Sequence, residues 1–245
     1  MSRHLMMRSA NPALGSNAFS KTHAAPGEST MTVDGTVNKT SFCLILLIIS
    51  ASHTWQNPSS SLMVAGGIIG FLVAIVTVFK KTWAPYTTPT YAVCKGLLLG
   101  GLSQVFEQRY PGIVSQAVFL TFGVLGALLL AYKSRLIRAT ENFKLGVFAA
   151  TGGIALVYLI NLVMGFFGSS IPMVHSASTF GILFSLFVVV IASLNLVLDF
   201  DFIEQGSESG APKYMEWYGA FGLLVTLVWL YIEILHLLSK LQSRR

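Results

Sequence analysis

Acidic residues stand inside or beside long apolar runs at two places in this sequence. The stretch NLVLDFDFIEQG, residues 195–206, carries Asp199, Asp201 and Glu204 at the end of one run. Glu233 interrupts a later run, LLVTLVWLYIEILHLL. A charged side chain at the centre of a bilayer costs about 2.5–3.5 kcal/mol on insertion scales, so these acids are expected to face a bundle interior or a water-filled cavity.

The two aspartates cannot share one face of a helix. They are two positions apart, which corresponds to a rotation of about 200° around a helix axis. Asn195 precedes Asp199 by four residues and lies on its face, whereas Asp201 pairs with Glu204 at the water edge. We therefore expect Asp199 to point inward and Asp201 to be partly solvated.

A carboxyl pair formed by Glu233 and either aspartate would suit pH sensing. Two acids that meet in a low dielectric titrate as one coupled unit. Their oxygens also suit a hard cation such as calcium, although no firm metal site is predicted. His236 follows Glu233 by three residues and either bonds to it or lies at the interface. Lys95 is either a counter-charge to the acids or a lysine that extends to the interface.

Three further polar residues of the apolar runs, Thr151, Asn161 and Ser185, receive no functional role. Backbone carbonyls can satisfy all of them.

The helices that must position these residues follow from the composition. The 245 residues are 53% hydrophobic and 11% charged, whereas ordinary soluble domains carry about 25% charged residues. The chain is therefore predicted to be an all-α integral membrane protein. Seven apolar runs approach the ~20 residues that cross a bilayer, and they lack the alternation of a β-barrel. They are 38–55, 62–79, 88–107, 112–132, 145–167, 179–202 and 217–238.

Two domains follow from this pattern. Residues 1–36 are expected to form a polar, disordered, cytoplasmic tail, which lacks the apolar core of a secretory signal, and residues 37–245 are expected to form the transmembrane domain. Cys43 and Cys94 are too few for a disulfide framework and lack metal-ligand spacing, so both are expected to be small core residues.

Basic residues fall between the apolar runs, which argues against a nucleic-acid surface. No nucleophile, zinc or phosphate-binding motif of an enzyme occurs.

The lysines and arginines predict a cytoplasmic N-terminus by the positive-inside rule. With that orientation, the inner segments hold Arg3, Arg8, Lys21, Lys39, Lys80, Lys81, Lys133, Arg135, Arg138, Lys144 and Lys213. The outer segments hold Arg109, Lys240, Arg244 and Arg245. The basic C-terminal tail disagrees with the rule, and we expect either an outside end or an incompletely crossing last segment.

Small and aromatic residues predict contacts and anchors. Gly96 and Gly100 have the small-xxx-small spacing of closely packed membrane helices, as do Gly66 and Gly70. The aromatic residues near span ends are typical of interfacial belts; they are Trp55, Trp83, Trp217 and Tyr218.

Several stretches resemble the bacterial YccA-like branch of the Bax-inhibitor family. They are RSANPAL, MTVDGTVNKT, NLVLDFDFIEQG and APKYMEWYGAFGLLVTLVWLYIEILHLL, and the resemblance covers almost the whole chain. It implies six helices around a central seventh, the bacterial inner (plasma) membrane, and a pH-sensitive calcium leak governed by one carboxylate on each of the last two helices. The sixth-helix acid falls on Asp199 or Asp201, and the seventh-helix acid on Glu233. The chain departs from the family pattern in four respects. They are a glutamate at position 233, two aspartates where one is expected, the longer loop that follows them, and Lys95.

Two functions compete on these grounds. The first is a calcium leak, with calcium as the transported ion and no cofactor. The alternative is a membrane interaction protein that modulates a membrane-bound AAA protease, as the resemblance implies, through its polar N-terminal tail. Removal of residues 1–30 would distinguish the two.

Overall fold

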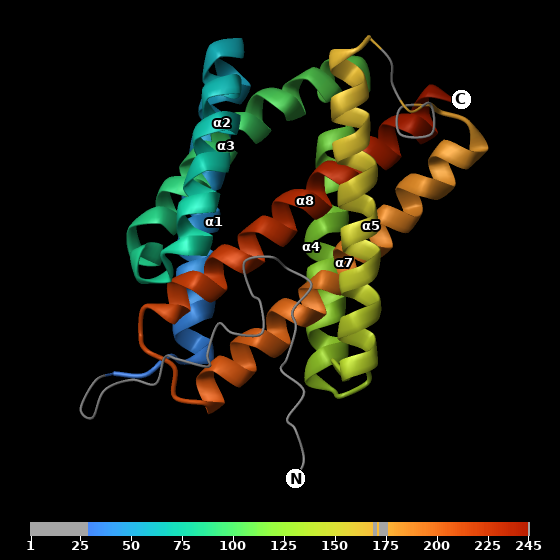
Figure 1. The fold of residues 1–245 in the computed structure, drawn as a ribbon. Helices are drawn as coiled ribbons and strands as arrows, with labels where there is room; N and C mark the ends of the chain where they lie inside the picture. Colours follow the sequence, from blue (N-terminus) through green and yellow to red (C-terminus); the bar gives the residue numbers. More distant parts are fainter. Residues whose placement is uncertain (1–28, 169–170, 172–175, 245) are drawn as a thin grey trace. The chain divides into compact units, whose positions relative to one another are not determined.

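The protein is built from long α-helices. The structure is a computed structural model that describes residues 29–168, 171 and 176–244. Seven α-helices occur in these residues (Figure 1), and a short 3-10 helix, η2 (Lys81–Trp83), precedes the third. They are α1 (Val33–Gln56), α2 (Ser60–Phe79), α3 (Ala84–Arg109), α4 (Ile113–Lys133), α5 (Glu141–Phe166), α7 (Thr179–Glu208) and α8 (Met215–Ser243). The predicted seven-helix, all-α membrane protein is confirmed.

Helix ends extend past the predicted boundaries because capping residues lie outside the apolar runs. Hydroxyl oxygens of Thr32, Ser59 and Thr140 accept backbone N–H groups at the starts of α1, α2 and α5. Helix α1 therefore begins at Val33, inside the range assigned to the polar tail. Residues 1–28 of that predicted tail lie outside the described residues.

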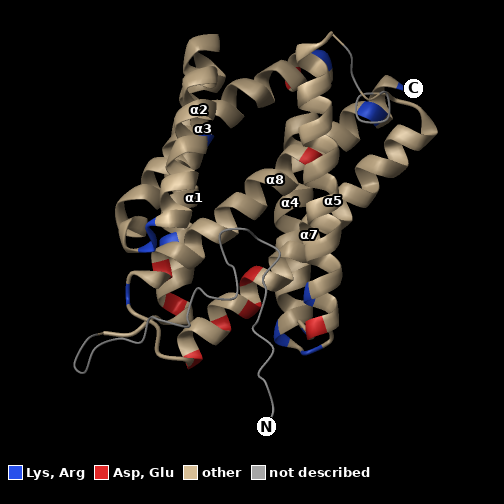
Figure 2. Ribbon diagram, in the orientation of Figure 1, with Lys and Arg blue, Asp and Glu red and all other residues tan. Residues whose placement is uncertain are grey.

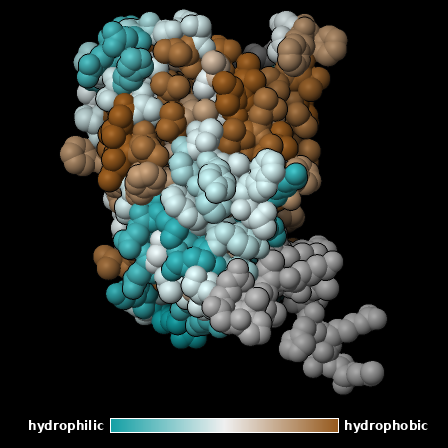
Figure 3. Space-filling view, turned by 90° about the vertical axis from the view of Figure 1, so that its left-hand side faces the viewer, coloured by the Kyte–Doolittle hydropathy of each residue, from teal (hydrophilic) through white to brown (hydrophobic). Residues whose placement is uncertain are grey.

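Six helices are long and apolar enough to cross a membrane. Helix α3 is not among them; its 26 residues include Lys95, Glu107 and Arg109. Figure 2 shows charged residues mainly toward the ends of the ribbons, with long uncharged stretches between them. Figure 3 shows extensive hydrophobic areas on the surface that it draws, with hydrophilic side chains gathered in separate areas. The protein is therefore an integral membrane protein.

The chain divides into two compact units. Unit 1 comprises Met1–Val105 with Asp199–Val225, and unit 2 comprises Phe106–Leu198 with Thr226–Arg245. Both α7 and α8 contribute residues to each unit. Of the six candidate spans, α8 is the most enclosed, with 67% of its apolar window buried, whereas α2 and α4 reach 17%.

Glycines let the helices of unit 1 approach closely, as their spacing predicted. A Cβ added at Gly96 of α3 would lie 1.9 Å from Ser50 Oγ and 2.3 Å from the Leu47 carbonyl of α1. One added at Gly100 would lie 2.0 Å from the Ala51 carbonyl, also of α1. These distances exclude any side chain, so α1 and α3 pack backbone against backbone.

Candidate functional site

Glu233 lies in the unit 2 part of α8, with 3% of its surface exposed. The Tyr158 hydroxyl, from α5, lies 2.9 Å from both carboxylate oxygens. The indole N–H of Trp229, one turn earlier in α8, donates to Oε1 over 3.1 Å. Two uncharged donors therefore hold this buried carboxylate, as buried acceptors require.

Packing fixes both donors. Ile154, Val188 and Ile191 form a buried apolar cluster from α5 and α7. Tyr158, Phe184 and Trp229 pack around it, and the rings of Tyr158 and Phe184 meet edge to face with centroids 6.4 Å apart. The apolar bodies of the two donor side chains thus belong to a core, while their polar atoms point at Glu233. The expectation that Glu233 faces inward is confirmed by its burial, whereas its partners were not foreseen.

Lys240 corrects the predicted end of the last helix. Helix α8 continues to Ser243, and Lys240 is 7% exposed instead of belonging to an outer tail. Its ammonium donates to Ser185 Oγ over 2.7 Å and to the Gly181 carbonyl over 3.2 Å, both in α7. Ser185 therefore binds a lysine, a role that the sequence did not indicate.

The two aspartates of α7 differ in burial as expected. Asp199 is fully buried, and Asp201 is partly exposed. The Gln205 amide donates to Asp201 over 2.5 Å, so this glutamine is a partner that the expected pairing with Glu204 did not include. Both aspartates belong to unit 1 and Glu233 belongs to unit 2.

The supporting residues have separate surroundings. Asn195, in unit 2, donates to Thr151 Oγ1 over 2.9 Å and to the Ile191 carbonyl over 2.8 Å, so it ties α7 to α5. The His236 ring packs against Phe106, with centroids 5.7 Å apart.

Lys95 of α3 is half-buried in unit 1, and its ammonium lies 5.6 Å from the centre of the Tyr91 ring. This contact is a local cation–π pair within the helix.

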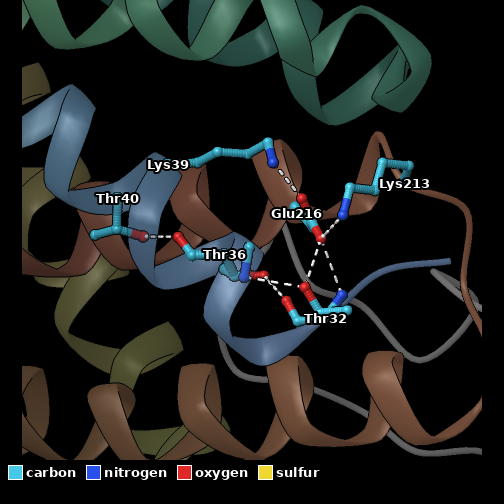
Figure 4. A network of polar contacts seen from close by, with 7 residues as sticks. Thr32, Thr36, Lys39, Thr40, Lys213 and Glu216 are labelled. Carbon is cyan, nitrogen blue, oxygen red and sulfur yellow. Dashed lines mark hydrogen bonds and ion pairs between the residues drawn. The ribbon is translucent and has the colours of Figure 1, made fainter. Parts of the chain in front are cut away.

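A second buried carboxylate, Glu216 of unit 1, was missed in the sequence. It is fully buried in the first turn of α8 and forms ion pairs with Lys39 of α1 and with Lys213, the latter over 2.8 Å. Oε1 also accepts from the backbone N–H and the hydroxyl of Thr32, over 3.0 and 2.9 Å. Figure 4 shows these groups converging on the carboxylate from α1 and from the segment before α8.

Glycine makes room for this carboxylate. A Cβ added at Gly35 would lie 2.0 Å from Glu216 Oε1, so the carboxylate rests against the first turn of α1. The free N–H groups and the dipole of a helix N-terminus favour a negative charge there. Acids are common in the first turn of a helix, so Glu216 looked like an ordinary helix-end residue in the sequence. Nothing in the sequence indicated its distant partners.

Backbone pairing joins the same two segments. The Met31 N–H donates to the Ala211 carbonyl over 2.7 Å, and the Lys213 N–H donates to the Ser29 carbonyl over 3.2 Å. The stretches MTVDGT and APKYMEW, which carried part of the resemblance, are thus in direct contact. Residues 29–36 belong to the folded structure.

The predicted aromatic anchors divide into two groups. Trp55 and Trp83 are 36% and 51% exposed, as interfacial residues are expected to be. Tyr218 is instead fully buried; it packs near Phe202 and Phe221, and the Lys81 ammonium lies 5.6 Å from its ring centre. Burial lowers the pKa of Lys81 from its ordinary value. Tyr218 was therefore wrongly predicted to be an anchor.

Within the described residues, no group of three or more His, Cys, Asp or Glu side chains could hold a metal ion together. A protein-family model described as Bax inhibitor 1 like matches residues 11–243. No curated protein matches the chain significantly.

Proposed function

The chain belongs to the Bax inhibitor 1-like family, and from this premise we propose that it is a pH-sensitive calcium leak controlled by Asp199, Asp201 and Glu233. The observation that supports the proposal is the burial of Asp199 and Glu233, at 0% and 3% exposed, in helices apolar enough to span a membrane. Ionisable residues at such positions typically mark ion or proton pathways.

Carboxylate chemistry explains both calcium and pH. Calcium prefers six to eight oxygen ligands, and carboxylates are among its usual ones. We propose calcium as the transported ion and not as a resident one. Protonation removes the charge that attracts the cation, so the same acids would make the flux depend on pH.

A flux assay tests the proposal. The purified protein is reconstituted into liposomes that contain a calcium indicator, and calcium entry is followed from about pH 6 to about pH 8, a range that shifted carboxyl groups can reach. We expect a pH-dependent flux in the wild type that is largely lost in Glu233→Gln. If calcium flux is unchanged in all of the variants Glu233→Gln, Asp199→Asn and Asp201→Asn, the proposed leak is refuted.

The two aspartates provide a matched comparison. Asp199→Asn removes a fully buried carboxylate, whereas Asp201→Asn removes a partly exposed one that Gln205 binds. We expect the first substitution to change the pH dependence of the flux more than the second does. Equal effects would mean that burial does not select the controlling acid.

For localisation, we propose the bacterial inner (plasma) membrane with the N-terminus in the cytoplasm. Within unit 1, Lys39 and Lys213 share Glu216, and Lys81 lies near Tyr218, so basic residues from three segments gather near the start of α8. This gathering fits the positive-inside rule.

Because the native Cys43 and Cys94 are buried, single reporter cysteines can test this orientation. A cysteine at exposed Asp34 should react with a membrane-impermeant maleimide only in inverted vesicles, and one at Gln56 only in right-side-out vesicles. The reverse pattern would overturn the orientation.

The alternative remains a protein that modulates a membrane-bound AAA protease. Since Ser29 and Thr30 pair with Lys213 and Pro212, the deletion that tests it should remove residues 1–28 and leave this pairing intact. Loss of protease coupling with normal calcium flux favours the alternative. Loss of flux with normal coupling favours the leak.

A further inference from the structure

The unit 2 part of α8 carries two buried side chains of opposite charge. Glu233 and Lys240 are 3% and 7% exposed. They are seven residues apart, so they lie on nearly the same face of the helix, with a rise of about 10.5 Å between them. The two residues are therefore fixed relative to each other by the helix itself.

Neither residue obtains its charge balance from its hydrogen bonds. The partners of Glu233 are the uncharged Tyr158 hydroxyl and Trp229 indole. The partners of Lys240 are the Ser185 hydroxyl and the Gly181 carbonyl. An uncompensated buried charge is costly, and in a low dielectric an opposite charge acts over a longer distance than it does in water.

Lys240 is not held like an ordinary lysine at a helix end. A lysine there usually extends its ammonium to water, and Arg244, directly after the end of α8, is exposed. Lys144, another buried lysine of unit 2, lies 3.5 Å from Glu141 and so has a carboxylate beside it. Lys240 instead turns to α7, where two oxygens fix its ammonium.

We propose that Lys240 is the resident counter-charge of Glu233, a tethered cation that stabilises the carboxylate when no metal ion is near. An entering cation then competes with the field of Lys240, so Lys240 sets the calcium concentration at which Glu233 responds. The second statement rests on the proposed calcium leak, whereas the charge coupling between the two side chains does not.

The first test measures calcium flux as a function of calcium concentration in proteoliposomes. Lys240→Gln should lower the half-saturating calcium concentration by about three- to tenfold, equivalent to removing a coupling of about 0.7–1.4 kcal/mol, with little change in the maximal rate. Lys240→Arg keeps the charge and should behave like the wild type. Lys133→Gln, at an exposed lysine of α4, is the control for lost positive charge. An unchanged half-saturating concentration in Lys240→Gln would overturn the assignment.

The second test separates this inference from the leak itself. Thermal unfolding is measured in detergent for Glu233→Gln, Lys240→Gln and the double variant, with Ser185→Ala as a variant that keeps both charges. Each single charge removal should lower Tm. The loss of Tm in the double variant should be clearly smaller than the sum of the two single losses. Additive losses would overturn the charge coupling. Coupled losses without calcium flux in the wild type would leave the coupling intact and refute the leak.

Discussion

Units 1 and 2 differ in the packing around their glycines and in the partners of their buried glutamates. In unit 1, Cβ atoms at Gly96 and Gly100 would collide with α1, and Glu216 is held by two lysines and the start of α1. In unit 2, the glycines with no neighbour within 4 Å of an added Cβ include Gly123, Gly126, Gly146, Gly152 and Gly153. There Glu233 is held by uncharged donors.

The difference distinguishes a carboxylate held by ion pairs from the one that we propose to be responsive. Glu216 is surrounded by positive charge, so its ionised form is the stable one and a cation gains little by approaching. Glu233 keeps a counter-charge two turns away, and its immediate partners do not neutralise it. Two glutamates on one helix thus have different surroundings, two lysines at Glu216 and uncharged donors at Glu233, and on this difference rests our proposal that Glu233 responds to cations.

The largest expected effect is that of Gly96→Leu. The side chain would meet the Leu47 carbonyl and Ser50 of α1, so helix α3 must separate from it. We expect Tm in detergent to fall by roughly 10 °C or more, since overpacking costs about 3 kcal/mol at such sites. Gly123→Leu in α4 is the matched control and should shift Tm little. Equal losses in both variants would show that the contrast between the units is not one of packing.

Glu216→Gln should be nearly as damaging. It leaves Lys39 and Lys213 without their carboxylate and costs about 3 kcal/mol in unfolding free energy, as breaking buried ion pairs does. Thermal unfolding in detergent measures the loss, and Asp34→Asn, an exposed acid in the first turn of α1, is the control. A loss of stability no greater than that of the control would contradict a stabilising role for the ion pairs of Glu216.

Tyr158→Phe tests the other glutamate. It removes the hydroxyl that contacts both oxygens of Glu233 while keeping the ring in the apolar cluster. The expected loss is about 1.5 kcal/mol, typical of a hydrogen bond to a charged group, together with a changed pH profile of calcium flux. Tyr86→Phe, at a tyrosine that is 79% exposed, should change neither quantity. An unaltered profile in Tyr158→Phe would indicate that this hydroxyl only supports the fold.

The smallest effect is expected for Lys213→Gln. The Lys213 side chain is 48% exposed, whereas that of Lys39 is 20% exposed. A pair so open to water contributes less than about 1 kcal/mol, and added salt should reduce it further. Tm measured at low and high salt checks this, with Lys39→Gln expected to cost more. A larger loss of Tm in Lys213→Gln than in Lys39→Gln would mean that burial does not decide the relative strength of the two ion pairs of Glu216.

Local patterns were sufficient for the helices and for part of the site. The seven apolar runs predicted seven helices because the apolar length needed to cross a bilayer is nearly constant. The angular offset between Asp199 and Asp201 predicted which of them is buried, since that offset is fixed by helix geometry. The spacing of Gly96 and Gly100 predicted a close helix contact for the same reason.

Partners distant in the sequence could not be predicted in this way. Tyr158 reaches Glu233 across 75 residues, and Thr32 reaches Glu216 across 184. Even within one helical turn, the spacing did not indicate that Gln205 binds Asp201. Lys240 was assigned to the outer tail because the last apolar run was predicted to end at residue 238, whereas α8 continues to Ser243.

The sequence by itself determined that this is a helical membrane protein, where its helices lie, and which acids stand among apolar residues. Composition and periodicity are properties of each segment, and the bilayer imposes the same requirements on every segment. Only the tertiary structure decided that Glu216 is clamped by lysines, that Glu233 is held by Tyr158 and Trp229, and that Lys240 is buried. These outcomes depend on which helix faces pack together, and that depends on the summed fit of many side chains.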